Sequence, residues 1–93
     1  MRFGNLKGFE WDSENLGKVS ERVSVEIVEE AFFAPAMVMP DTEHSSPGEV
    51  RLILICLSLQ RPLFCVFTVR HGWVRVISAR YMHAKEVKKY EGS

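Results

Sequence analysis

The chain has 93 residues, of which 46% are hydrophobic and 26% are charged, and its formal net charge is zero. This length indicates one domain spanning residues 1–93, because a half-length unit would bury too little apolar surface to offset the entropy of ordering itself. The longest apolar run, residues 52–59, is too short to cross a membrane, and the N-terminus has no apolar segment typical of a signal peptide. We therefore expect a cytoplasmic protein that binds no membrane.

The zero net charge hides an uneven distribution along the chain. Residues 1–50 carry 4 Lys+Arg and 10 Asp+Glu, whereas residues 51–93 carry 8 Lys+Arg and 2 Asp+Glu. The basic half leaves nucleic-acid binding open, and pairing of the two halves with each other across the fold is the alternative.

The reactive side chains form no metal-binding or nucleotide-binding motif. Cys56 and Cys65 lie in neither a CxxC nor a CxxH spacing, and the three histidines are scattered over a loop, a turn and the start of a helix. Zinc sites need closely spaced ligands, so we predict no metal site. The sequence also lacks a glycine-rich phosphate loop, and we expect no cofactor.

The N-terminal part predicts a short strand and a weak helix. Residues 9–12, "FEWD", are half apolar and suit an edge strand. Asp12 or Ser13 is a suitable N-cap for a helix over residues 13–21, although Gly17 weakens it.

A firmer helix follows. It begins at Ser24, a good N-cap, has apolar residues at helical spacing through Phe32, and ends before Pro35. Residues 37–39 allow a short strand, and the proline-rich and polar stretch over residues 40–48 indicates a surface loop.

The second half predicts three strands, over residues 51–59, 62–70 and 73–80. The first is almost continuously apolar, which is typical of a strand buried on both faces. The other two flank His71 and Gly72, which form a two-residue hairpin turn.

This turn predicts the register of the hairpin. Val69 faces Val74, and Leu63 faces Arg80 if the alternation is unbroken. Arg70 and Arg80 then lie on opposite faces of the sheet, so a site that holds both needs a bulge or a twisted edge.

A second turn at Gln60 and Arg61 would place Cys56 opposite Cys65. In a cytosolic protein such a pair is more often two reduced thiols than a disulfide.

The hydrophobic period changes from strand to helix after Arg80. Residues 82–90 predict a short helix with Val87 inward and the lysines outward. The expected fold is therefore α+β, a small antiparallel sheet with helices packed against it, in the order β-α-α-(β)-β-β-β-α.

With these elements in place, the sequence resembles the BrnT toxin family, the toxin half of bacterial type II toxin–antitoxin pairs. The motifs occur in the family's order over nearly the whole chain, and the ordered set is more specific than any one of them. They are "FEWD" and "NLGK" near the start, "SVEIVEEAFF" in the second helix, "GEVR" before the central strand, "FTVR" and "VISAR" in the hairpin, and "KEVKKY" at the end.

The resemblance implies a RelE-like fold and a toxin that cleaves RNA without a metal ion and so arrests growth. It also implies neutralisation by a BrnA-type antitoxin with a ribbon-helix-helix module, and contact with DNA only indirectly, through that antitoxin. Residues 1–93 would then form a single BrnT-like toxin domain.

The resemblance further implies site residues. Arg80 and Arg70 are expected to bind the scissile phosphate, since a guanidinium stays charged and binds two phosphate oxygens in parallel. Glu86 and Tyr90 are the expected proton carriers, and His83 is near enough in the sequence to compete for that task. For Arg80, Arg70 and His83, an ordinary solvent-exposed side chain is the alternative.

The expected RNA-binding residues lie on three parts of the chain. They are Arg51, Arg75, Trp11, Lys85, Lys88 and Lys89. Trp11 would stack a base, with a core position as its alternative, and the three lysines would attract RNA as a solvated helix surface.

One departure from the family leads to a second hypothesis. Many members have "KHGVS" or "RHGVS" before the second helix, whereas this chain has "SERVS", so the histidine is missing or replaced by Arg22. The alternative function is a catalytically inactive module of the same fold that only binds an antitoxin or another regulatory partner.

Overall fold

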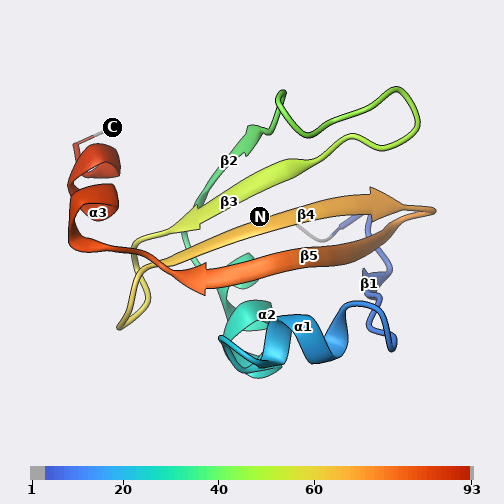
Figure 1. Cartoon of the computed structure of the whole chain (residues 1–93), viewed down its shortest axis with the longest axis horizontal. Helices are drawn as coiled ribbons and strands as arrows, with labels where there is room; N and C mark the ends of the chain where they lie inside the picture. Colours follow the sequence, from blue (N-terminus) through green and yellow to red (C-terminus); the bar gives the residue numbers. More distant parts are fainter. Residues whose placement is uncertain (1–3, 93) are drawn as a thin grey trace.

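The structure, a computed structural model, describes residues 4–92 and shows within them one five-stranded sheet and three helices (Figure 1). The strands are β1 (Gly8–Phe9), β2 (Met37–Pro40), β3 (Leu52–Cys56), β4 (Leu63–Arg70) and β5 (Trp73–Tyr81). The helices are α1 (Leu16–Ser20), α2 (Val25–Phe33) and α3 (Ala84–Tyr90). The α+β class and the predicted order of elements are confirmed, including the short strand after α2.

The sheet is mixed, so the prediction of a purely antiparallel sheet is wrong. Its strand order is β1-β5-β4-β3-β2; β1 runs parallel to β5, and the other neighbouring pairs are antiparallel.

The predicted strand over residues 9–12 stops at Phe9. Trp11 leaves the ladder and donates its indole N–H to Glu29, and the Asp12 carboxylate accepts backbone N–H groups of the turn that leads into α1.

The two N-terminal helices differ in how closely they match the sequence pattern. α1 begins only at Leu16, later than predicted, because the Asp12 turn occupies the preceding residues. α2 begins as predicted, with the Ser24 hydroxyl accepting the N–H of Ile27 at 3.4 Å, and it ends at Phe33. No helix within residues 4–92 has the length and apolar character needed to span a membrane.

The hydrophobic core lies between one face of the sheet and helices α1 and α2. Phe32 of α2 makes edge-to-face contacts with Phe67 and Phe9, at ring-centroid distances of 4.9 and 5.2 Å. The other buried apolar side chains on this face of β3, β4 and β5 are Leu54, Cys56, Leu63, Cys65, Val74, Val76 and Ala79. Val19 of α1 packs against the same cluster, so helices α1 and α2 cover the same face of the sheet.

The turn of the β4–β5 hairpin is confirmed. His71 and Gly72 both adopt positive φ, 52° and 85°, as a two-residue hairpin turn requires. Val69 faces Val74 as predicted, so the register near the turn is the one that the sequence indicates.

Farther from the turn, a β-bulge shifts the hairpin register by one residue. Leu63 faces Tyr81 rather than Arg80, and Arg80 faces Phe64. Ile77 is the residue of β5 without an opposed residue in β4. The predicted pairing of Leu63 with Arg80 is therefore wrong, and the physical reason is clear: without the bulge the arginine would point into the core.

The β3–β4 connection is longer than the predicted two-residue turn. Cys56 faces Leu63 and Cys65 faces Leu54, so the predicted pairing of the two cysteines is wrong. Both thiols are free and buried. Burial in apolar surroundings raises the pKa of the Cys65 thiol far above its ordinary value, which keeps it protonated and unreactive.

Phe32 offers a direct test of this core. Phe32→Ala should lower the free energy of unfolding by about 3–5 kcal/mol, because it removes a fully buried ring and leaves a cavity. Phe33→Ala is the matched control, since that neighbouring ring is 65% exposed. Urea unfolding measures both, and equal losses for the two variants would contradict the described packing.

Candidate functional site

The bulge places the expected catalytic arginines on one face of the sheet. Directly opposed residues share a face, and Arg70 faces Trp73 while Arg80 faces Phe64. Residues 64 and 70 of β4 point to the same side by alternation, so the predicted placement of the two arginines on opposite faces is wrong. Six residues of strand, about 20 Å, still separate Arg70 from Arg80, so one phosphate group does not contact both.

Arg80 lies at the junction between β5 and α3, where it forms a two-pronged ion pair with Glu86. Nη1 and Nη2 of the guanidinium donate to Oε1 and Oε2 of the carboxylate, each at 2.7 Å. The guanidinium carbon lies 4.4 Å from the ring centroid of Phe64. The backbone N–H of His83 donates to Oε1 of Glu86 at 3.0 Å, so one carboxylate holds both the arginine and the start of α3.

This geometry fixes the ionisation of the pair. The hydrogen bonds from Arg80, followed by the backbone bond from His83, lower the pKa of Glu86 from 4.5 to about 2. The same carboxylate raises the pKa of Arg80 above its ordinary value. Both groups are therefore charged at neutral pH, and Glu86 is better suited to holding Arg80 than to accepting a proton.

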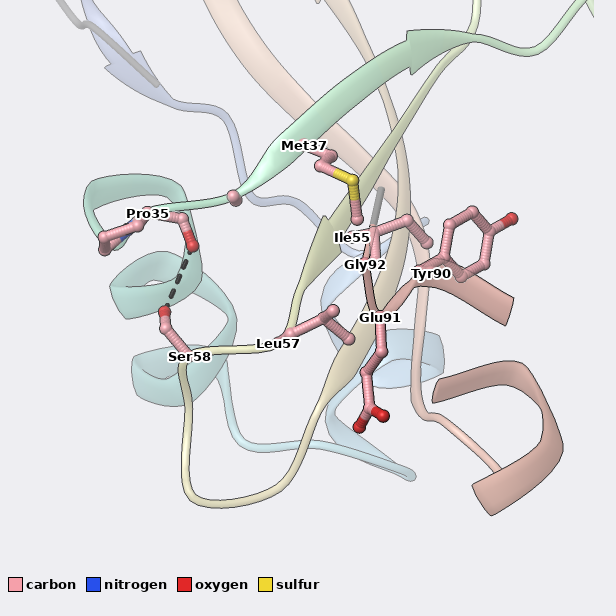
Figure 2. A pocket seen from close by; sticks show the side chains of 9 residues that line it. Pro35, Met37, Ile55, Leu57, Ser58, Tyr90, Glu91 and Gly92 are labelled. Atoms are coloured by element: carbon pink, nitrogen blue, oxygen red, sulfur yellow. Dashed lines mark hydrogen bonds between the residues drawn. The ribbon is translucent and has the colours of Figure 1, made fainter. Parts of the chain in front are cut away.

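Tyr90 lies four residues after Glu86 on α3, and its interaction with Arg80 contributes to the raised pKa of the guanidinium. Figure 2 shows its ring beside Met37 and Ile55, at an apolar groove of about 530 Å³ between α3 and the ends of β2 and β3. The structure thus gathers three of the five expected catalytic residues, Arg80, His83 and Glu86, around the start of α3, and Tyr90 is the last residue of the same helix.

The fifth, Arg70, lies near the hairpin turn and pairs with a different carboxylate. Glu49, in the loop before β3, accepts from Arg70 at 2.8 Å and from Arg51 at 3.1 Å. These two bonds lower the pKa of Glu49. Arg51 and Arg70 therefore form one cluster, separate from the cluster around Arg80.

Arg75 is held most firmly of the expected RNA-binding residues. Its side chain is only 8% exposed, and it donates to Asp12 at 2.7 and 3.1 Å and to Glu10 at 3.2 Å. The Arg75 guanidinium lowers the pKa of Asp12 from 3.8 to about 2. This pairing joins the acidic N-terminal half to the basic C-terminal half, which was the alternative explanation of the charge distribution.

The remaining expected RNA-binding residues lie on the core side of the sheet and on α3. Trp11 is partly buried against the core and is bonded to Glu29 of α2 at 2.8 Å. Lys85, Lys88 and Lys89 are exposed on α3. The lysines share the helix of Glu86 and Tyr90, whereas Trp11 packs on the other side of the sheet.

The sequence reasoning missed two cations that lie beside Arg80. A hollow of about 300 Å³ is lined by Lys18, Glu21 and Arg22 from α1 and the turn after it, and by Ser78, Ala79 and Arg80 of β5. The family's histidine before α2 is either missing from this chain or replaced by Arg22. Periodicity alone gave no signal for Lys18 or Arg22, because both lie on exposed positions of a short, weak helix and its turn.

A second hollow, of about 180 Å³, lies toward the hairpin turn. Lys18 lines it as well, together with Arg51, Arg70 and Arg75, and with the carboxylates of Glu14 and Glu49. Three of the expected arginines, Arg51, Arg70 and Arg75, therefore line one hollow, and Lys18 also lines the hollow that contains Arg80. Within residues 4–92, no group of His, Cys, Asp or Glu side chains is arranged to hold a metal ion.

Comparison with known proteins gives one match. A family model described as "Ribonuclease toxin, BrnT, of type II toxin-antitoxin system" matches residues 11–86. A search of curated proteins and a search of solved structures found no match.

The Arg80–Glu86 pair makes stability depend on acid. Because the pKa of Glu86 falls from 4.5 to about 2 on folding, its contribution is complete above pH 4.5 and is lost as the pH drops toward 2. Glu86→Gln should lower the melting temperature at neutral pH. It should also make the melting temperature fall less steeply over this acid range, and the fall that remains is due to Asp12 and Glu49.

The control for this measurement is Glu43→Gln, which changes an exposed loop carboxylate. Thermal melts followed by circular dichroism over the acid range should give parallel curves for this variant and the unchanged protein. If the melting temperature of Glu86→Gln falls with decreasing pH as steeply as that of the unchanged protein, the pair does not stabilise the fold.

Proposed function

Because the chain belongs to the BrnT family of ribonuclease toxins of type II toxin–antitoxin systems, we propose that it is an endoribonuclease that cleaves RNA without a metal ion and arrests growth. The observation that supports this most strongly is the cluster of Arg80, His83 and Glu86 at the start of α3, with Tyr90 at the end of the same helix. It combines a fixed cation with groups able to move protons, in a partly exposed position.

The proposed reaction uses the RNA's own 2′-hydroxyl as the nucleophile. Its oxygen attacks the adjacent phosphorus, its proton passes to a base, and the bond from phosphorus to the 5′ oxygen breaks as that oxygen takes up a proton. The products are a 2′,3′-cyclic phosphate and a 5′-hydroxyl. The protein has to align the phosphate, stabilise its growing negative charge and carry the protons.

The residues at the start of α3 divide these tasks in the proposal. Arg80 stabilises the charge on the phosphate, and Glu86 positions Arg80 and stays ionised. His83 is exposed beside them and is one proton carrier, and Tyr90 is the second. Arg70 acts at a neighbouring phosphate, because about 20 Å of strand separates it from Arg80.

The same proposal covers the wider surface and the partner. Arg51 and Arg75 bind the RNA backbone near the hairpin turn, Lys85, Lys88 and Lys89 attract RNA to α3, and Trp11 is the candidate for base stacking. A type II toxin has an antitoxin partner; we propose one of BrnA type with a ribbon-helix-helix module, which covers the basic half of a RelE-like toxin in the cytoplasm.

A second candidate function is a module that binds its antitoxin but does not cleave RNA. Two observations favour this second candidate. Arg51, Arg70, Arg75 and Arg80 each pair with a carboxylate of the same chain, and the family's histidine is absent before α2. RNA must displace or share those carboxylates before it binds the arginines.

Expression in bacteria with and without the antitoxin separates the two candidates. The unchanged protein should arrest growth and fragment RNA, and the antitoxin should suppress both effects. Arg80→Ala should abolish arrest, and Arg80→Lys should restore it only weakly, because a lysine keeps the charge but loses the two-pronged geometry. Colony counts and RNA gels measure these outcomes.

The matched control is Arg61→Ala. Arg61 is an exposed arginine whose guanidinium stacks on Tyr81 at 3.7 Å, outside both hollows, so arrest should persist. Full viability and intact RNA with the unchanged protein, together with retained antitoxin binding, would favour the inactive module instead.

A further inference from the structure

The two hollows beside α1 lie next to each other and outline a path along β5. Lys18 lines both, with Ser78 and Arg80 on the side toward α3 and Arg75 on the side toward the hairpin turn. Their lining residues include six Lys or Arg side chains and three Glu side chains. Cations outnumber carboxylates among the lining residues, and Glu10, Asp12 and Glu86 bond to Arg75 and Arg80 from outside the lining.

The cations of this path differ in how available they are. Arg75 and Arg80 have their guanidinium groups bonded to Asp12 and Glu86. For Lys18 and Arg22, in contrast, the described part of the chain supplies no carboxylate within ion-pair distance. An incoming phosphate can pair with Lys18 or Arg22 without displacing an internal partner, because no existing ion pair has to break first.

The dimensions of the path favour a single strand over a duplex. From Arg75 to Arg80 the strand extends about 15 Å, which matches a few nucleotides of one backbone. Recognition of duplex RNA uses contacts across successive grooves over about 16 base pairs, far more than this path offers. A charged groove that follows one backbone is the usual means of binding single strands.

We propose that Lys18 and Arg22 bind the backbone phosphates of single-stranded RNA and place the strand against Arg80, with the Ser78 hydroxyl as an additional donor. The inference rests on the proposed ribonuclease function and deepens it, because it names the strand type and the entry path. Internally paired Arg80 then meets RNA that is already held by unpaired cations, and displacement of Glu86 becomes an intramolecular step.

Binding of a labelled, uncleavable probe tests the inference. The probe is a short single-stranded oligonucleotide with 2′-O-methyl riboses, and its fluorescence anisotropy gives affinity over a range of salt concentrations. Lys18→Ala and Arg22→Ala should each weaken binding several-fold and each reduce the slope of log affinity against log salt by about 0.7. Lys18→Arg should retain most of the affinity, and a duplex of the same sequence should bind more weakly than the single strand.

Lys7→Ala is the control, since it removes one exposed positive charge outside both hollows. Circular dichroism melts confirm that each variant is folded.

If Lys18→Ala and Arg22→Ala bind the probe as well as Lys7→Ala does, the path is wrong although the ribonuclease function stands. If the unchanged protein binds no RNA, both the path and the proposed function fail. If the two variants bind RNA normally but are no longer neutralised by the antitoxin in cells, this surface belongs to the antitoxin and the inference is overturned.

Discussion

One extra residue in β5 determines where the chemistry of this fold lies. Without a partner opposite Ile77, the strand shifts by one position and turns Arg80 out of the core and onto the face that carries Arg70 and Arg75. The shift also places Ala79 and Tyr81 on the core side, where their side chains pack well. Packing and function thus favour the same irregularity, because the regular register would bury a guanidinium among apolar side chains.

The second general feature is internal charge pairing. Acidic residues of the N-terminal half, Glu10, Asp12 and Glu49, bind arginines of the C-terminal half, and Glu86 binds Arg80 within that half. These bonds stabilise the ionised carboxylates and hold the arginines in fixed rotamers. They neutralise Arg51, Arg70, Arg75 and Arg80 in a protein that we propose to bind a polyanion. Within residues 4–92, Lys18 and Arg22 have no carboxylate at ion-pair distance, and in our proposal they attract the RNA.

The sequence predicted the elements better than their arrangement. The Ser24 cap, the stop before Pro35 and the His71–Gly72 turn follow from local chemistry, and each is present. Strand direction and the bulge were not predictable in this way, because β1 pairs with β5 across more than sixty residues of chain and one inserted residue leaves no signature in a two-residue alternation.

The same limit applies to the site. Arg80, His83 and Glu86 are near in sequence, so their proximity followed from the strand-to-helix transition. Their separation from Arg70 follows from the register and length of the hairpin. The approach of Lys18 and Arg22 to Arg80 depends on how α1 packs beside β5, which no local pattern indicates.

The chemistry of the cleaved ends tests the central claim most directly. Purified protein, incubated with single-stranded RNA in the presence of a metal chelator, should yield fragments that end in a 2′,3′-cyclic phosphate and begin with a 5′-hydroxyl. A substrate with a single 2′-deoxy residue at the cleavage position should resist cleavage there. Fragments with 3′-hydroxyl and 5′-phosphate ends, or cleavage that stops when the chelator is added, would contradict the account.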